Sequence, residues 1–149
     1  MNTFPNSIRE QLLQAVITTL APIATAMGAT LFRSPVNAIL RENTPAIVVF
    51  PEEEKVASQN TVTTRTLTIR VVALAREVGA NEGEIVADQL ITACHAALMA
   101  DNNLGGLCLK IRELGTEWDT EDADARAVAI PARYTIEYRT HVNDLTLKA

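Results

Sequence analysis

The stretch TVTTRTLTIRVVALAR, residues 61–76, decides the fold class of this chain. Its apolar residues recur at every second position, and they are Leu67, Ile69, Val71, Ala73 and Ala75. Polar residues fall largely on the alternate positions, and they are Thr64, Thr66, Thr68, Arg70 and Arg76. Because successive side chains of a strand point to opposite faces, the pattern predicts a long strand with one buried and one solvated face. Val72 and Leu74 interrupt the polar side, which favours a second contact there, with a neighbouring element or with another subunit.

The segment just before this strand predicts a second, buried strand. The run AIVVF at 46–50 is rich in β-branched residues and is bracketed by Pro45 and Pro51. Residues 52–60 follow with three glutamates, a lysine and turn-forming Ser and Asn. Like charges and turn formers predict that this acidic connection is a mobile loop.

Two helices are expected. Ser7 and Glu10 form a capping-box pattern that starts the first helix, Pro22 should kink or restart it, and Gly28 should end it. Asn81 is the expected N-cap of the second, which should stop around residues 101–103. The apolar stripe of the first helix is Ile8, Leu12, Val16, Leu20, Ile23, Ala24 and Met27. The expected inner side of the second is Ile85, Val86, Leu90, Ala93, Cys94, Ala97 and Leu98.

The last third predicts two more strands joined by an acidic loop. Gly105 and Gly106 suit a tight turn, after which residues 107–112 alternate as a strand, with Leu107, Leu109 and Ile111 on one side. An acidic loop at 117–124 leads to a final alternating strand, and Pro131 should lie at an edge or a bulge because it lacks an amide donor. A short polar tail follows. The expected fold is α+β, one domain over residues 1–149, with two helices packed on one face of a mainly antiparallel sheet.

Composition narrows the function classes. The chain has 149 residues and a formal net charge of -5. This negative charge argues against sequence-independent binding to nucleic-acid phosphates. One alternative stays open, because five arginines could align on one sheet face as a local basic patch: Arg65, Arg70, Arg76, Arg133 and Arg139. Residues 8–20 do not form a secretory apolar region, and no apolar run is long enough for a membrane helix, so a cytoplasm-like compartment is expected.

The sequence contains few patterns that are typical of a catalytic site. His95 is adjacent to Cys94, but neighbouring helical residues point about 100° apart, so they are not expected to form a nucleophile and base pair. Cys94 and Cys108 are expected to be reduced core thiols. The acidic loop offers hard oxygen ligands but lacks the glycine and distal glutamate of a calcium-binding EF-hand loop, so a solvated loop or docking surface is favoured. No catalytic residue, metal or cofactor is predicted. Trp118, inside this loop, either folds over the sheet edge or anchors a protein interface.

The order of several short motifs resembles tail terminator proteins of long-tailed bacteriophages and prophages, of the lambda minor tail protein U type. The resemblance spans nearly the whole chain. Its motifs are Ile8–Leu12, Pro45–Phe50, Leu104–Leu107, Gly115–Trp118, Glu121–Asp124, Tyr134–Thr140 and Asn143–Thr146.

This resemblance implies a non-enzymatic protein that forms a homohexameric ring on the finished tail tube. The ring would stop tube polymerisation and offer a docking surface to the head-side connector or completion protein. The implied partners are further copies of the chain, the tail tube protein and that connector, and a monomeric subunit before assembly is left open. DNA would pass through the lumen without specific binding, which suits an acidic protein. The implied location is the virion tail, assembled in the host bacterial cytoplasm.

The matching motifs imply two sets of contact residues. A partner-facing loop would use Glu117, Trp118, Asp119, Glu121, Asp122 and Asp124. A subunit or tube contact would use Arg139, Thr140, Asn143 and Asp144. Three alternatives remain open: another neck protein such as a head-tail adaptor or completion protein, a small hydrolase or metal-dependent enzyme using the acidic loop, and a small-ligand binding module.

Overall fold

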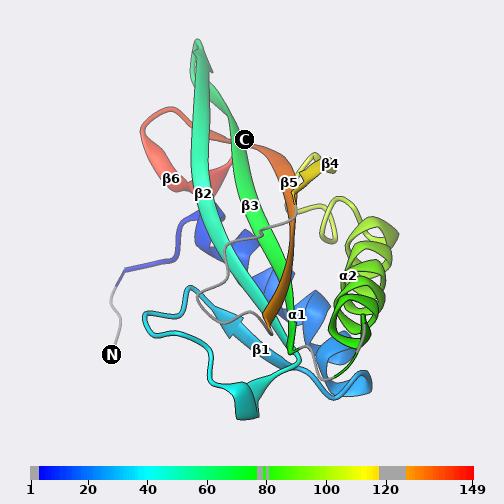
Figure 1. Cartoon of the computed structure of the whole chain (residues 1–149). Helices are drawn as coiled ribbons and strands as arrows, with labels where there is room; N and C mark the ends of the chain where they lie inside the picture. Colours follow the sequence, from blue (N-terminus) through cyan, green and yellow to red (C-terminus); the bar gives the residue numbers. More distant parts are fainter. Residues whose placement is uncertain (1–3, 77–78, 80, 118–126) are drawn as a thin grey trace.

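A computed structural model describes residues 4–76, 79, 81–117 and 127–149 of the chain (Figure 1). Its elements are α1 (Ile8–Ala26), β1 (Thr30–Arg33), the short 3-10 helix η1 (Arg41–Asn43), β2 (Ala46–Gln59), β3 (Val62–Arg76), α2 (Glu82–Ala100), β4 (Lys110–Thr116), β5 (Ala127–His141) and β6 (Asp144–Lys148). The fold is therefore α+β, with two α-helices and a curled, mostly antiparallel sheet.

The sheet has six strands in the order β1-β2-β3-β5-β4, and β6 pairs with β5. Only the pairing of β1 with β2 is parallel. β3 pairs with β5 along its whole length, from Val62 opposite His141 to Arg76 opposite Ala127. Since β3 occupies one edge of β5, β4 and β6 share the other edge, and β4 pairs with residues 132–137.

The core lies against one face of this sheet. The predicted inner row of β3 is buried throughout, and Tyr134, Ile136 and Tyr138 of β5 are each no more than 2% exposed. These residues form one cluster with buried residues from both helices, which include Leu12, Val16, Leu20, Leu90, Cys94 and Leu98. We call this the core face of the sheet and the opposite side the outer face. The predicted alternation of β3 and β5 is confirmed, and it defines both faces.

Helix α1 begins as predicted and runs as one helix to Ala26. The Ser7 hydroxyl accepts a hydrogen bond from the Glu10 amide at 3.0 Å, which satisfies one donor at the start of the helix. The helix runs through Pro22 instead of restarting there. Pro22 has no amide hydrogen, so the Thr18 carbonyl lacks its usual helical hydrogen bond. Both residues are exposed, and water can bind the Thr18 carbonyl instead. Gly28 has a positive φ of 65° after the last turn, as a helix-ending glycine should.

The prediction of a loop at residues 52–60 is wrong. β2 continues through the acidic segment to Gln59, and the hairpin turns at Asn60, whose φ is 58°. The strand persists because two of the glutamates are paired with arginines from distant parts of the chain. The resulting β2–β3 hairpin is long, and its tip forms one end of the molecule in Figure 1.

Smaller corrections concern the second helix. Ile85 and Val86 are 54% and 37% exposed, although they were expected on the inner side of α2. The buried positions of the helix are instead Gly83, Ala87, Leu90, Cys94 and Leu98. That set follows a helical spacing of three and four residues; Ile85 lies off this stripe, and Val86 lies at its edge.

The C-terminal third also differs in detail. Residues 101–109 form turns, so the strand begins only at Lys110, with Cys108 buried and Leu109 exposed, the reverse of the prediction. The expected polar tail is the strand β6. Pro131 lies just beyond the end of β4, where its carbonyl accepts a bond from the Glu117 amide. The Pro131 nitrogen, which has no hydrogen to donate, lies on the same side of β5 as this carbonyl, where the β4 pairing has already ended. The position matches the expected edge position.

Candidate assembly surfaces

Only one residue of the first predicted contact region, Glu117, lies in the described part of the chain. Glu117 is exposed at the end of β4, and its amide donates to the Pro131 carbonyl at 3.2 Å. Arg139, from the second region, is eight positions after Pro131 on β5, about 26 Å along the strand at roughly 3.3 Å per residue. The other predicted loop residues lie outside the described part of the chain: Trp118, Asp119, Glu121, Asp122 and Asp124.

The second region is formed by the β5–β6 hairpin and the tip of the β2–β3 hairpin. The Val142 amide donates to the Thr61 carbonyl at 2.9 Å, which joins the two turns. Arg139 and Asn143 are exposed there. Asp144 accepts bonds from the amide and hydroxyl of Thr146, and these bonds lower the pKa of Asp144. The structure thus brings the predicted residues of this region together at one end of the sheet.

Thr140 has an inward position within this region. Its side chain is buried and its hydroxyl accepts a bond from Arg65 Nε at 3.1 Å. The Thr140 hydroxyl in turn donates to the His141 carbonyl at 3.0 Å. Thr140 therefore positions the hairpin, while Arg139 and Asn143 are the members that face solvent.

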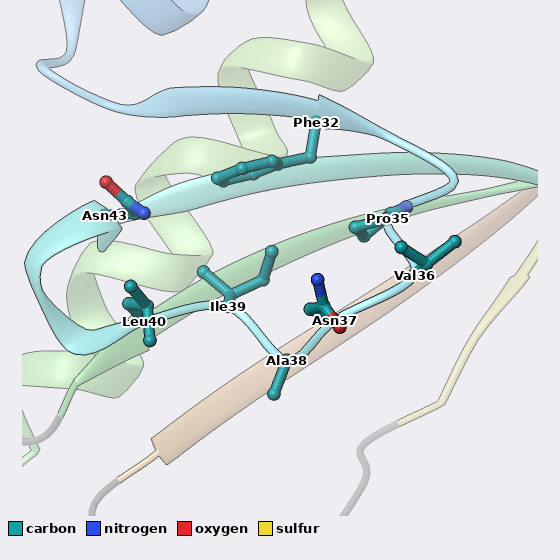
Figure 2. Close-up of a pocket in the computed structure, with 8 residues that line it drawn as sticks. All are labelled: Phe32, Pro35, Val36, Asn37, Ala38, Ile39, Leu40 and Asn43. Carbon is teal, nitrogen blue, oxygen red and sulfur yellow. The ribbon is translucent and has the colours of Figure 1, made fainter.

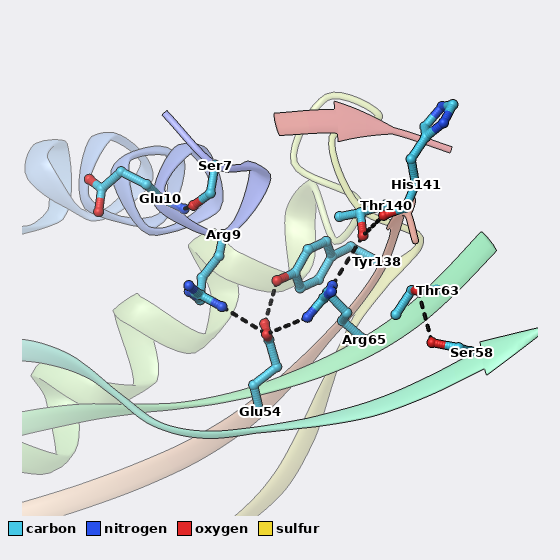
Figure 3. A network of polar contacts seen from close by, with 10 residues as sticks. All are labelled: Ser7, Arg9, Glu10, Glu54, Ser58, Thr63, Arg65, Tyr138, Thr140 and His141. Atoms are coloured by element: carbon cyan, nitrogen blue, oxygen red, sulfur yellow. Dashed lines mark hydrogen bonds and ion pairs between the residues drawn. The ribbon is translucent and has the colours of Figure 1, made fainter. Parts of the chain in front are cut away.

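A polar network on the core face connects this end of the sheet to α1 (Figure 3). Glu54 is at its centre, and its side chain is 12% exposed. Its carboxylate accepts from Arg9 at 2.8 Å, from Arg65 at 3.2 Å and from the Tyr138 hydroxyl. Burial and the adjacent Glu54 carboxylate raise the pKa of Tyr138. The network fastens β2, β3 and β5 to the first turn of α1, because each partner of Glu54 comes from a different element.

A second acidic residue, Glu52, pairs with two arginines of the outer face. Glu52 is the extra residue of a β-bulge, and its two oxygens accept from Arg70 at 2.6 Å and Arg133 at 2.9 Å. The Arg70 guanidinium also lies 5.4 Å from the centre of the Phe50 ring. Arg65, by contrast, lies on the core face with Glu54. The arginines that could have formed one basic patch are thus divided between two faces, and Arg65, Arg70 and Arg133 are paired with carboxylates.

Cys94 and His95 are not arranged as a nucleophile and a base. Cys94 is fully buried, and burial raises its pKa to about 12, so its thiol stays neutral at physiological pH. His95 points elsewhere, with its Nδ1 2.8 Å from the Tyr134 hydroxyl. Burial also raises the pKa of Cys108, to about 11. Within the described residues, no group of three or more His, Cys, Asp or Glu side chains is placed to hold a metal ion.

An open apolar groove lies beside β1 (Figure 2). Phe32 of β1 and residues 35–40 of the following segment line most of it, and Val36 is 96% exposed. Sequence reasoning missed this groove, because residues 34–43 have no regular period. Among the described residues, neither α-helix is long and apolar enough to cross a lipid bilayer.

Comparison with solved structures finds a similar fold in a chain of the virion of a native gene transfer agent particle. The match has a TM-score of 0.59 and 15% sequence identity, and it covers 83% of this chain and 91% of the other. No protein-family model and no curated protein sequence matches the chain. The protein therefore shares its fold, over most of its length, with a component of a virion particle.

Proposed function

We propose that this protein is a non-enzymatic virion component that forms a ring at the end of a phage-type tail tube, where it stops tube polymerisation and provides the head-joining surface. The observation that carries the proposal is the fold shared with a virion chain over 83% of this sequence. The order of motifs that resembles tail terminators supports the same reading independently.

The two separated contact regions also support a ring. In a closed ring, one patch of each subunit meets a different patch of the next, and the ring surfaces that meet the tube and the connector are different again. A subunit that exposes Glu117 and Arg139, which lie in two separate regions, can supply such contacts. The proposed partners are other copies of the chain, the tail tube protein and a head-side connector or completion protein.

The acidic composition suits a ring through which DNA passes. A net charge of -5 repels the phosphate backbone, and ion pairs with Glu52 and Glu54 neutralise three arginines of the sheet. DNA should therefore pass without being held.

The test is to add purified protein to tail-tube subunits as they polymerise. We expect the mean tube length to fall as the amount of protein rises, because a terminator blocks the growing end. A head-tail adaptor or completion protein would form a ring without shortening tubes. Unchanged tube lengths at every ratio would therefore reject the terminator role and favour another neck protein.

A further inference from the structure

Two exposed surfaces of this chain complement each other in charge, in the spacing of their charges and in direction. The first is on the edge strand β4. Ile111 is fully buried opposite Ile136 on the core face, so Lys110 and Arg112 project from the outer face, where both are exposed. Leu114 follows them and is 51% exposed. We call Lys110, Arg112 and Leu114 the β4 row.

The second surface is a groove along the first half of α2. Its lining residues are Glu84, Ile85, Asp88, Gln89 and Ile130. Ile85 contributes an exposed apolar side chain beside these carboxylates. Helix α2 contains no lysine or arginine, and no ion pair among the described residues engages Glu84 or Asp88. We call this surface the α2 groove.

The spacing of charges agrees between the two surfaces. Glu84 and Asp88 are one helical turn apart, about 6 Å along the axis. Lys110 and Arg112 are two residues apart on a strand, about 6.6 Å. Each surface also has one exposed aliphatic side chain beside its charges, Ile85 on the helix and Leu114 on the strand. The β4 row can therefore meet the α2 groove with two ion pairs and one apolar contact.

The β4 row and the α2 groove lie on opposite sides of the sheet, so they cannot bind each other within one chain. The β4 row projects from the outer face, whereas Ile130, at the floor of the α2 groove, belongs to the core cluster on the other face. Within one chain the sheet separates the two surfaces. A pair of α2 grooves would repel each other, as would a pair of β4 rows. A second copy of the chain, docked head to tail, supplies the matching surface in both cases.

We propose that the β4 row of one subunit binds the α2 groove of the next copy of this chain. This contact rests on the proposed self-assembly and names the surfaces that make it. Repeating it leaves one free row and one free groove at each stage until the assembly closes. Arg139 and Asn143, at the His141 end of β5, are not part of this contact, which leaves them for the tube or the connector.

Charge reversal tests the contact in the full-length protein, by sedimentation velocity over a concentration series at low salt. Asp88→Arg and Arg112→Glu should each weaken self-association by roughly tenfold or more, because each places like charges across the contact. Combining the two reversals in one chain should restore association to near the wild-type level. Arg41→Glu and Glu42→Arg, which reverse exposed charges on η1, serve as matched controls and should leave association unchanged.

Three results would overturn the contact: a wild-type chain that stays monomeric at every concentration, single reversals that behave like the η1 controls, or a double reversal that restores nothing. Binding of duplex DNA that is lost in Arg112→Glu, with self-association intact, would assign the β4 row to nucleic acid instead. Failure of the proposed function looks different, since it would leave the charge-reversal pattern intact while tube lengths stay unchanged.

Discussion

Replacing Glu54 with glutamine should destabilise the protein more than any other conservative change on β2. The glutamate accepts two charged hydrogen bonds, from Arg9 and Arg65, and one from the Tyr138 hydroxyl. Glutamine keeps the shape and one acceptor but turns an amide donor toward the guanidinium groups. The Arg65 side chain is only 11% exposed, so water cannot readily replace the hydrogen bond that its guanidinium loses.

The size of the effect follows from these exposures. Hydrogen bonds to charged groups contribute about 1.5–3 kcal/mol each, but the Arg9 side chain is 40% exposed and its bond is weakened by water. We therefore expect the free energy of unfolding to fall by about 2–3 kcal/mol. For a domain of this size that corresponds to a decrease in Tm of roughly 4–12 °C.

Urea denaturation followed by circular dichroism measures this change, and Glu53→Gln is the matched control. Glu53 is exposed on the same strand, so its substitution should change the free energy by no more than about 0.5 kcal/mol. A double-mutant cycle of Glu54→Gln with Arg65→Gln should show a coupling of about 1 kcal/mol or more. Equal midpoints for the Glu54 and Glu53 variants would refute the argument that the network fastens the sheet to α1.

Three further predictions concern titration and reactivity. The Arg33 guanidinium forms two 2.6 Å hydrogen bonds with the Glu10 carboxylate and lowers the pKa of Glu10 from 4.5. The pair therefore stabilises the protein at pH values above 4.5. The difference in stability between the wild type and Arg33→Met should disappear as the pH falls through the lowered pKa of Glu10. Burial raises the pKa of Tyr134 and Tyr138, the only two tyrosines of the sequence. Tyrosinate absorbance should therefore appear only above the pH at which free tyrosine ionises, and the free energy of unfolding should decline as the pH rises through that region. If either tyrosine ionised at the pH of free tyrosine, its burial in the core would be contradicted. Cys94 and Cys108 should react with iodoacetamide far more slowly in the native protein than in denaturant, because their thiols are buried and neutral; fast labelling at neutral pH would show that the core opens readily.

Local periodicity was enough to predict the elements that carry the core. The alternation of β3 and β5 requires only that one face be buried, and Leu67, Ile69 and Ile136 obey it without reference to the rest of the chain. The start of α1 was equally local, since Ser7 and Glu10 are one turn apart. Such patterns depend on neighbours within a few residues, and the sequence displays them directly.

Long-range pairing was the information that the sequence did not display. Glu52 and Glu54 suggested a loop because their neighbours are also acidic. Their actual partners include Arg133 and Tyr138, more than 80 positions away. The inward position of Thr140 depends in the same way on Arg65, 75 positions away. The exposed Ile85 shows a different limit, since an apolar residue on a helix can serve a contact between chains as well as a core.

The position of the protein on finished tubes decides whether it is a terminator. Purified full-length protein carrying a gold label is mixed with preformed tail tubes and examined by negative-stain electron microscopy. We expect a ring-shaped label at one tip of each tube and none along the shaft. Label distributed along the shaft, or absent from tubes altogether, would contradict it.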